Sequence, residues 1–133
     1  MALKTKTIKQ SVNIKATPHE VYEILMDSKK HSQLTGAKAS ISRKVGGKFE
    51  VYDSYAFGKN VELVSDKKIV QSWSTTDWPA GVFSTATFLL TPTKTGTKLT
   101  FTQIGVPIEN AKDIAEGWQD YYWKPLKEML ETK

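Results

Sequence analysis

The chain has 133 residues, of which 39% are hydrophobic and 25% are charged. These values are typical of one ordinary globular domain, residues 1–133, and the absence of any run of about 18 apolar residues excludes a helical membrane span. There are no cysteines, which excludes disulfides and thiolate metal sites and agrees with a cytoplasmic protein.

The net charge of +5 is unevenly distributed along the chain. Residues 1–48 hold ten Lys/Arg against three Asp/Glu, whereas residues 49–133 hold nine against eleven. A basic half suits an acidic protein partner, an anionic lipid or nucleic acid, or it forms a solvated lysine-rich surface. No RNP-like aromatic strand, zinc finger or basic heptad helix is present, so we expect no nucleic-acid partner.

The first part of the chain predicts a strand followed by two short helices. Apolar residues alternate over residues 7–14, which is the pattern of a half-buried strand. Thr17 at the N-cap, Pro18 at the next position and Glu20 at N3 form a capping box that predicts a helix start. Residues 28–36 predict a second short helix or turn that ends at Gly36.

Six short runs with a period of two follow, and they are rich in Val, Ile, Thr, Phe and Trp. The breaks between them carry turn residues, which predicts consecutive antiparallel strands in a meander. The six runs are ASISRK, GGKFEVYDSY, KNVELVSD, KKIVQSWST, VFSTATFLLTP and TKLTFTQ.

A long final helix is predicted after Pro107, with Asn110 and Asp113 at its start. A curved antiparallel sheet with one apolar face needs a cover, and only this helix is long enough. The chain is therefore predicted to have an α+β fold in which the sheet grips the C-terminal helix.

The stretch EGWQDYYWKPLKEML places large aromatics on this helix. At about 100° per residue, Trp118, Tyr121 and Tyr122 lie on the predicted buried stripe and Trp123 lies outside it. Gly117 is expected to permit a close backbone approach, and Pro125 is expected to bend the helix.

Aromatic residues on the sheet and the last helix have two interpretations. They form either a packed core or the wall of an apolar ligand cavity, since both are built from aromatic side chains. The candidate cavity residues are Tyr52, Trp73, Phe88, Phe101, Trp118 and Tyr122.

The sequence gives little sign of catalytic chemistry. His19 and His31 are the only histidines and show no metal-ligand spacing, and no nucleophile elbow or phosphate loop is present. We therefore predict no catalytic residue, no metal and no cofactor. Trp78, in the tip DWPAG, either folds back as a plug or contacts a partner.

Five blocks, in this order, resemble the family of activators of heat-shock protein 90 (Hsp90) ATPase, within the START-like helix-grip superfamily. The resemblance covers about residues 10–132 and implies a sheet of six to seven strands around a long C-terminal helix, with two short helices after the first strand. The blocks are ATPHEVYEILMDSKKHSQLTGAKA, VGGKFEVYD, IVQSWSTTDWPAG, TFLLTPTKTGTKLTFTQIGVP and EGWQDYYWKPLKEML. Ser54 departs from the glycine that many members have there, and Val82 departs from a frequent histidine.

The resemblance implies a monomeric, non-enzymatic domain that docks on Hsp90 and modulates its ATPase. The co-chaperone that it resembles has a separate N-terminal domain with an Asn/Trp-rich motif, for which these 133 residues hold no counterpart. Charged and aromatic side chains would make the contact with Hsp90. They are Lys29, Lys30, Lys38, Arg43, Lys44, Lys48, Trp78 and Trp123.

Two alternatives follow from START-like relatives. One is a carrier of a lipid or other hydrophobic small molecule in the cavity between the sheet and the last helix. The other is an enzyme, whose signature would be a carboxylate such as Asp53 or Glu62 facing that cavity.

Overall fold

The structure, a computed structural model, describes residues 4–131. The elements follow the predicted order along the chain: one strand, two helices, six strands and a last helical segment. Their bounds are β1 (Thr5–Ile14), α1 (Pro18–Met26), α2 (Ser28–Thr35), β2 (Ser40–Ile41), β3 (Lys48–Val51), β4 (Ala56–Val64), β5 (Lys68–Thr75), β6 (Ser84–Thr93), β7 (Gly96–Pro107), α3 (Ala111–Trp118), the π-helical turn η1 (Gln119–Trp123) and α4 (Lys124–Glu131).

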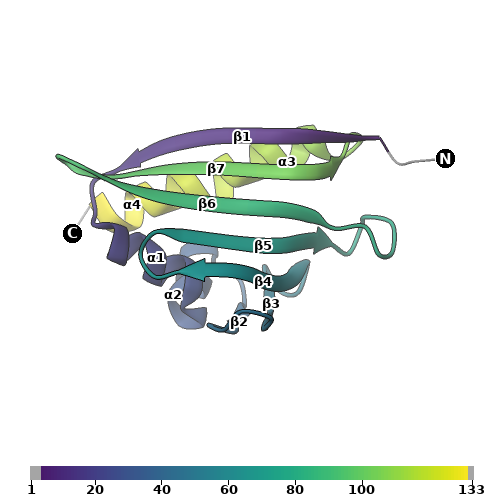
Figure 1. Cartoon of the computed structure of the whole chain (residues 1–133), viewed down its shortest axis with the longest axis horizontal. Coiled ribbons are helices and arrows are strands. Elements are labelled where there is room, and N and C mark those ends of the chain that lie inside the picture. The colour runs from purple at the N-terminus through teal and green to yellow at the C-terminus, as the bar shows by residue number, and fades with distance from the viewer. Residues whose placement is uncertain (1–3, 132–133) are drawn as a thin grey trace.

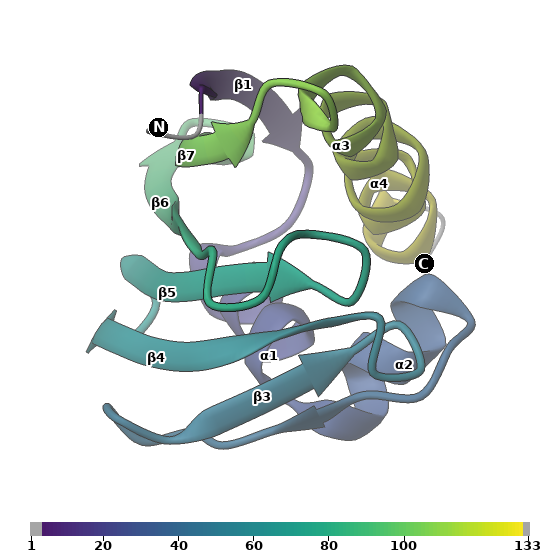
Figure 2. The same cartoon turned by 90° about the vertical axis from the view of Figure 1, so that its right-hand side faces the viewer.

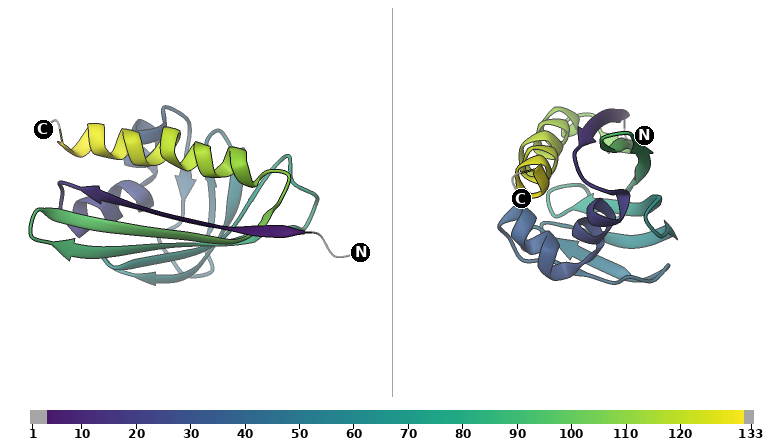
Figure 3. Two further views of the ribbon diagram at one scale, coloured as in Figure 1. Left: turned by 90° about the horizontal axis from the view of Figure 1, so that it is seen from above. Right: turned by 90° about the vertical axis from the view of Figure 1, so that its left-hand side faces the viewer.

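The seven strands form one antiparallel sheet in the order β1-β7-β6-β5-β4-β3-β2 (Figure 1). Strands β2 to β7 are the predicted meander, and β1 returns to pair with β7, with Ile14 opposite Thr97 and Thr5 opposite Pro107. Figure 2 shows the sheet curling around the last helical segment, and Figure 3 shows that segment running lengthwise over the sheet. The predicted α+β helix-grip fold is confirmed.

The predicted local signals of the two short helices are confirmed. The Thr17 hydroxyl accepts a hydrogen bond from Glu20 N, and the Glu20 carboxylate accepts one from Thr17 N, both at 3.1 Å. Helix α2 ends at Gly36, whose φ of 72° lies in the left-handed region that glycine adopts readily.

Two predicted strand runs are shorter in the structure. The run 39–44 contributes only Ser40–Ile41, and the run 46–55 ends as a strand at Val51. The second ends there because Tyr52, Asp53 and Ser54 all adopt positive φ, at 57°, 56° and 68°. A left-handed backbone cannot continue a strand, so the chain turns directly into β4.

In the last helical segment, the sequence prediction was wrong about which aromatic side chains are buried. Lys124 N donates to Gln119 O, five residues back, so η1 holds one residue more than an α-helical turn. That extra residue carries Trp123 back over Trp118, and the two indoles stack at 5.6 Å with an interplanar angle of 18°. Trp123 is therefore buried, at 2% exposure, whereas Tyr121 is 50% exposed. Pro125 is the second residue after this turn, which agrees with the expected irregularity because proline cannot donate to Tyr121 O.

Candidate functional site

The inner part of the space beneath the last helix is a filled aromatic core, made of Phe88, Phe101, Trp118 and Trp123. All four side chains are buried. Phe101 lies 4.4 Å from Trp118, 5.0 Å from Phe88 and 5.4 Å from Trp123 between ring centroids. Rings at these separations pack as a core and leave no ligand-sized space between them. Of the two interpretations of Phe88 and Phe101, packing is the one that the structure favours.

Two glutamines satisfy the indole N–H groups of this aromatic core. Trp118 Nε1 donates to Gln103 Oε1 at 2.8 Å, and Gln103 Nε2 donates to Ser84 Oγ at 2.9 Å. Trp123 Nε1 donates to Gln10 Oε1 at 2.6 Å, and Gln10 Nε2 donates to Ala115 O at 2.9 Å. Buried polar groups cost free energy unless they are paired, so these bonds fix the register of the helix on β1 and β7.

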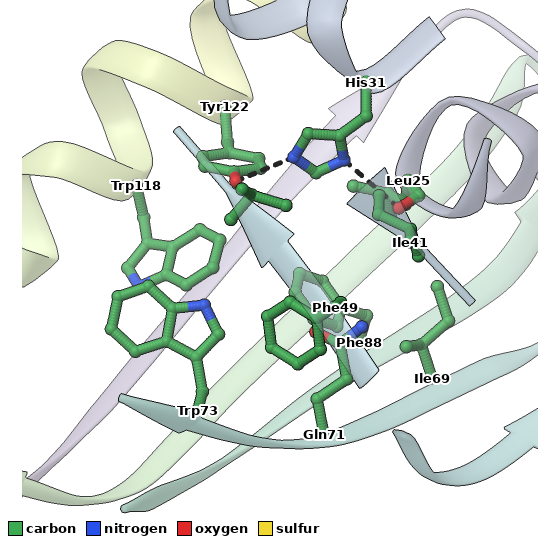
Figure 4. Close-up of a pocket in the computed structure, with 11 residues that line it drawn as sticks. Leu25, His31, Ile41, Phe49, Ile69, Gln71, Trp73, Phe88, Trp118 and Tyr122 are labelled. Atoms are coloured by element: carbon green, nitrogen blue, oxygen red, sulfur yellow. Dashed lines mark hydrogen bonds between the residues drawn. The ribbon is translucent and has the colours of Figure 1, made fainter. Parts of the chain in front are cut away.

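A small void beside the aromatic core is lined by a buried histidine, His31, to which no role was assigned from the sequence. His31 lies in α2, is 4% exposed, and lines a cavity of about 20 Å³, room for roughly one water (Figure 4). Its Nδ1–H donates to Leu25 O at 3.2 Å, so Nε2 accepts from the Tyr122 hydroxyl at 2.8 Å. Burial lowers the pKa of His31 to about 4, whereas burial raises the pKa of Tyr122. The pair is therefore neutral at pH 7.

A larger pocket opens beside the void, between the last helix and the β3–β4 turn, and we call it the mouth pocket. Its volume is about 410 Å³. The lining residues are Val51, Tyr52, Tyr55, Ala56, Trp73, Asp113, Ile114, Gly117, Trp118, Tyr121 and Tyr122. Four predicted cavity residues (Tyr52, Trp73, Trp118 and Tyr122) line it, and the predicted Phe88 and Phe101 do not.

Three lining residues were missed or misjudged from the sequence. Tyr55 was not selected, and Tyr121 was assigned to the buried stripe. Gly117 was expected to allow close backbone packing, but a Cβ there would meet only the Tyr121 ring at 3.8 Å. The absence of a side chain at Gly117 therefore leaves space for the pocket.

The left-handed turn at Tyr52–Ser54 forms one rim of the mouth pocket. Each non-glycine residue in this conformation costs about 1 kcal/mol or more. The turn is held by Asp53, whose carboxylate accepts from Lys38 N at 2.8 Å and whose N–H donates to Lys38 O at 3.0 Å. It presents the Tyr52 ring to Tyr121 at 5.2 Å between centroids. Strain of this kind is characteristic of ligand clamps.

The β5–β6 tip carries Trp78 into the interior, so the prediction that Trp78 is a partner contact is wrong. Its side chain is 5% exposed and packs edge-on against Trp73 at 5.6 Å. Within residues 4–131 its Nε1 has no hydrogen-bond partner. The prediction of Trp123 as a partner contact is wrong for the same reason, since that ring lies in the aromatic core.

All six predicted basic residues are exposed; we call the five on α2, on β3 and in the loops on either side of β2 the basic corner, namely Lys29, Lys30, Lys38, Lys44 and Lys48. Helix α2 is fixed beside β2, because Ser28 Oγ accepts from Ile41 N at 2.8 Å and Ser32 Oγ accepts from Ala39 N at 2.9 Å. The sixth residue, Arg43, is ion-paired with Glu23 of α1.

A groove on the outer face of the sheet adjoins the basic corner, and the sequence analysis did not identify it. Its volume is about 590 Å³, and Lys48 and Lys59 lie opposite each other across β3 and β4 along it. Phe57 and Phe83 also line it, 5.8 Å apart and edge-to-face, and Phe83 is 46% exposed. The only feature of the sequence that indicates this groove is an aromatic residue at an outward position of β4 and another directly before β6.

Of the carboxylates, Asp113 lines the mouth pocket, whereas Asp53 and Glu62, the two named as possible marks of an enzyme, do not. Asp53 binds the Lys38 backbone, and Glu62 forms an ion pair with Lys68 at 3.1 Å. In the part of the chain that the structure describes, no three His, Asp or Glu side chains are grouped to hold a metal ion. None of the helices within residues 4–131 has the length and apolar character needed to cross a membrane.

A curved antiparallel sheet that grips a C-terminal helix beside an aromatic pocket defines a protein of the helix-grip class. Comparison with known families is more specific: the model of the family "Activator of Hsp90 ATPase homolog 1-like protein" matches residues 15–131. The chain belongs to this family.

Individual relatives agree with the family assignment. Human activator of 90 kDa heat shock protein ATPase homolog 1 is 30% identical over 114 residues, which cover 86% of this chain and 34% of that protein. A Dictyostelium discoideum homologue is 30% identical over 116 residues, covering 86% of this chain and 30% of that protein. The chain thus spans about a third of the length of these relatives.

Solved structures share the fold at lower identity. An HSP90 activator from Plasmodium falciparum superposes with a TM-score of 0.88 at 24% identity, covering 94% of this chain and 96% of that chain. The solution structure of the Aha1 dimer from Colwellia psychrerythraea superposes with a TM-score of 0.81 at 18% identity, covering 95% of this chain and 96% of that chain.

Proposed function

We propose that this chain acts as one cytoplasmic domain that docks on Hsp90 and modulates its ATPase without chemistry of its own. The observation that carries the proposal is membership of a family named for activation of the Hsp90 ATPase, with a match over residues 15–131. Curated relatives at 30% identity carry the same name.

The basic corner and the outer groove supply a surface suited to such docking. Lys29 and Lys30 lie in the first turn of α2, where positive charge opposes the helix dipole, so fold stability does not account for them. Lysines at the rim steer an acidic partner. The exposed Phe83, in edge-to-face contact with the half-buried Phe57, provides the apolar anchor that Trp78 and Trp123 do not.

Charge reversal tests the surface. In calorimetric titrations with purified Hsp90 at low salt, Lys29→Glu/Lys30→Glu is expected to weaken binding by about tenfold or more, because each lysine loses a favourable long-range interaction. Lys9→Glu/Lys98→Glu is the matched control, since it makes the same charge change on exposed positions of β1 and β7. An equal loss of Hsp90 affinity in both variants would show that the effect comes from the net charge of the protein and not from the position of these lysines.

The apolar anchor has its own test. Phe83→Ala is expected to weaken Hsp90 binding, and Ile108→Ala, which truncates another exposed apolar side chain, is expected not to. ATP turnover by Hsp90 is measured with each variant. If the unmodified chain neither binds Hsp90 nor changes its ATPase rate, the proposed function is wrong.

We propose that the chain acts as a monomer. Strand β1 is an edge of the sheet, and it carries Lys6 and Lys9, a pattern that opposes pairing with a second edge strand. The Colwellia psychrerythraea protein is described as a dimer, so light scattering at micromolar concentration gives a direct check. A mass of about 15 kDa supports the monomer, and twice that value overturns it.

A second candidate function is the binding of an apolar small molecule in the mouth pocket. The observation that favours it is the pocket volume of about 410 Å³ with six aromatic residues in the lining. This volume lies within the usual range of about 300–1,000 Å³ for small-molecule sites.

A further inference from the structure

The lining of the mouth pocket has an unusual charge for this chain. The protein has 19 Lys/Arg and a net charge of +5, yet no Lys, Arg or His lines the pocket. Within residues 4–131, Asp113 is the only charged residue of the lining. An anionic headgroup entering the pocket would therefore find no positively charged side chain to pair with.

Two further carboxylates lie at the rim. The Tyr55 hydroxyl donates to Asp77 Oδ1 at 3.1 Å, and Thr75 Oγ1 donates to the same oxygen. Asp53 is fixed in the left-handed turn by the Lys38 backbone. Asp113 lines the same pocket as Tyr55. Burial raises the pKa of Tyr55, and the negative charges of Asp77 and Asp113 raise it further.

Among the described residues, no ion pair to a basic side chain is found for these carboxylates. The ion pairs among residues 4–131 join Asp66 with His19, Glu23 with Arg43, Glu62 with Lys68 and Asp120 with Lys124. None includes Asp53, Asp77 or Asp113. The pocket entrance therefore carries carboxylates that these ion pairs leave uncompensated.

The aromatic rings of the lining also favour a positively charged group. The face of a tyrosine or tryptophan ring attracts a cation that lies within about 6 Å of the ring centroid. Tyr52 and Tyr121 meet at 5.2 Å at the mouth, and Trp73 and Trp118 meet at 5.5 Å deeper in the wall. Several rings around one space, with a carboxylate at the edge, form a suitable cage for an ammonium group.

From this composition we propose that the mouth pocket selects small molecules that carry an ammonium group on an apolar body, and rejects anionic amphiphiles. The inference rests on the second candidate function above, because it specifies the charge of the ligand that this pocket would take. The apolar part of the ligand lies against Val51, Ala56 and Ile114, and the ammonium group lies between the tyrosines and Asp113.

A ligand series of one chain length tests the charge preference. Octyltrimethylammonium, 1-octanol and octanoate are titrated below their aggregation limits into the full chain, with binding measured by calorimetry. The ammonium compound is expected to bind about tenfold or more tightly than the alcohol, and octanoate is expected to bind most weakly.

Two variants locate the effect. Asp113→Asn is expected to weaken binding of the ammonium compound several-fold and to leave the alcohol unchanged. Glu109→Gln removes the same charge from an exposed position outside the lining and is expected to change neither. Tyr121→Leu keeps an apolar wall and is expected to lower the preference for the ammonium compound.

The possible outcomes distinguish the charge preference from small-molecule binding itself. Binding of all three compounds with equal affinity, or tightest binding of octanoate, would overturn the charge preference and leave the apolar pocket. If none of the compounds binds, both the charge preference and small-molecule binding at this pocket are overturned.

Discussion

The space beneath the last helix has two parts built from the same residue types. In the aromatic core, Phe101 and Trp123 are buried and the indole N–H of Trp123 is paired with Gln10. At the mouth pocket, Tyr121 is half exposed, a left-handed turn places Tyr52 edge-on against it at 5.2 Å, and the space that both rings border measures about 410 Å³. Aromatic content alone therefore does not distinguish a core from the wall of a binding pocket. The two parts differ in whether the polar atoms of the rings are paired inside the protein and in whether the backbone beside them is strained.

The π-helical turn is what divides the two parts. Its extra residue places Trp123 over Trp118 and turns Tyr121 outward, two positions earlier in the chain. One helical turn thus completes the core with one ring and borders the pocket with another. π-helical turns are frequent at functional sites, which agrees with this position.

Truncating one ring on each side gives the largest expected contrast. Trp123→Ala removes a buried ring and leaves a cavity, so the free energy of unfolding should fall by about 3–5 kcal/mol. Tyr121→Ala removes an exposed ring, so the loss should be about 1 kcal/mol or less. Urea unfolding of both variants measures the difference. Similar losses would show that the two parts do not differ in packing.

The buried His31 makes stability depend on pH. Its pKa is about 4 in the folded protein and 6.5 in an unfolded chain, so only the unfolded chain takes up a proton between these values. Stability is therefore full above about pH 6.5 and falls as the pH drops toward 4, by about 3 kcal/mol over the whole window.

His31→Gln removes this titration while keeping an acceptor for the Tyr122 hydroxyl. Urea unfolding at pH 7.5 and at pH 4.5 should show a smaller loss in this variant than in the unmodified chain. His19→Gln is the matched control, because it also removes one imidazole, from the exposed pair with Asp66. An unchanged loss in His31→Gln would contradict the buried neutral state.

Removing a hydrogen-bond acceptor tests whether paired indoles matter to the core. Gln103→Leu leaves Trp118 Nε1 without its acceptor, and burying an unpaired donor should lower the free energy of unfolding by about 1–3 kcal/mol. Gln33→Leu, at an exposed position of α2, is the control. A loss of the same size in the control would assign the effect to helix or strand propensity.

The smallest expected effect concerns the rim of the mouth pocket. Ser54 has a φ of 68°, so Ser54→Gly should relieve backbone strain. Glycine also makes the unfolded chain more flexible, which offsets part of this gain, so the free energy of unfolding should rise by about 0.5 kcal/mol. Ser65→Gly, at an exposed turn residue without positive φ, should lower it. The opposite signs are read from thermal or urea unfolding, and a loss in both would contradict strain at Ser54.

Local signals in the sequence predicted most of the fold. The Thr17–Glu20 capping box and the Gly36 helix end depend on neighbouring residues, and both were identified. The strands of the meander were recognised from alternation and turn residues, and the pairing of β1 with β7 joins segments about 90 residues apart. The resemblance to a helix-grip family implied one sheet of six to seven strands around the last helix, and the pairing of β1 with β7 was not predicted.

The site was predicted less well, because it depends on departures from regular geometry. The uniform 100° spacing misplaced Trp123 and Tyr121, since no residue type marks where a π-helical turn inserts. Three successive left-handed residues shape the rim, and only the family glycine at the position of Ser54 signalled them. His31 is buried within the polar run SKKHSQLT, because α2 packs its imidazole against Tyr122.

The most direct measurement follows the indole N–H signals of the four tryptophans by NMR during titration with octyltrimethylammonium. If the mouth pocket is the binding part and the aromatic core is not, the Trp73 signal shifts and saturates while the Trp123 signal stays in place. A Trp123 shift as large as that of Trp73, or no shift of either signal at saturating ligand, would contradict the division between core and pocket on which this account rests.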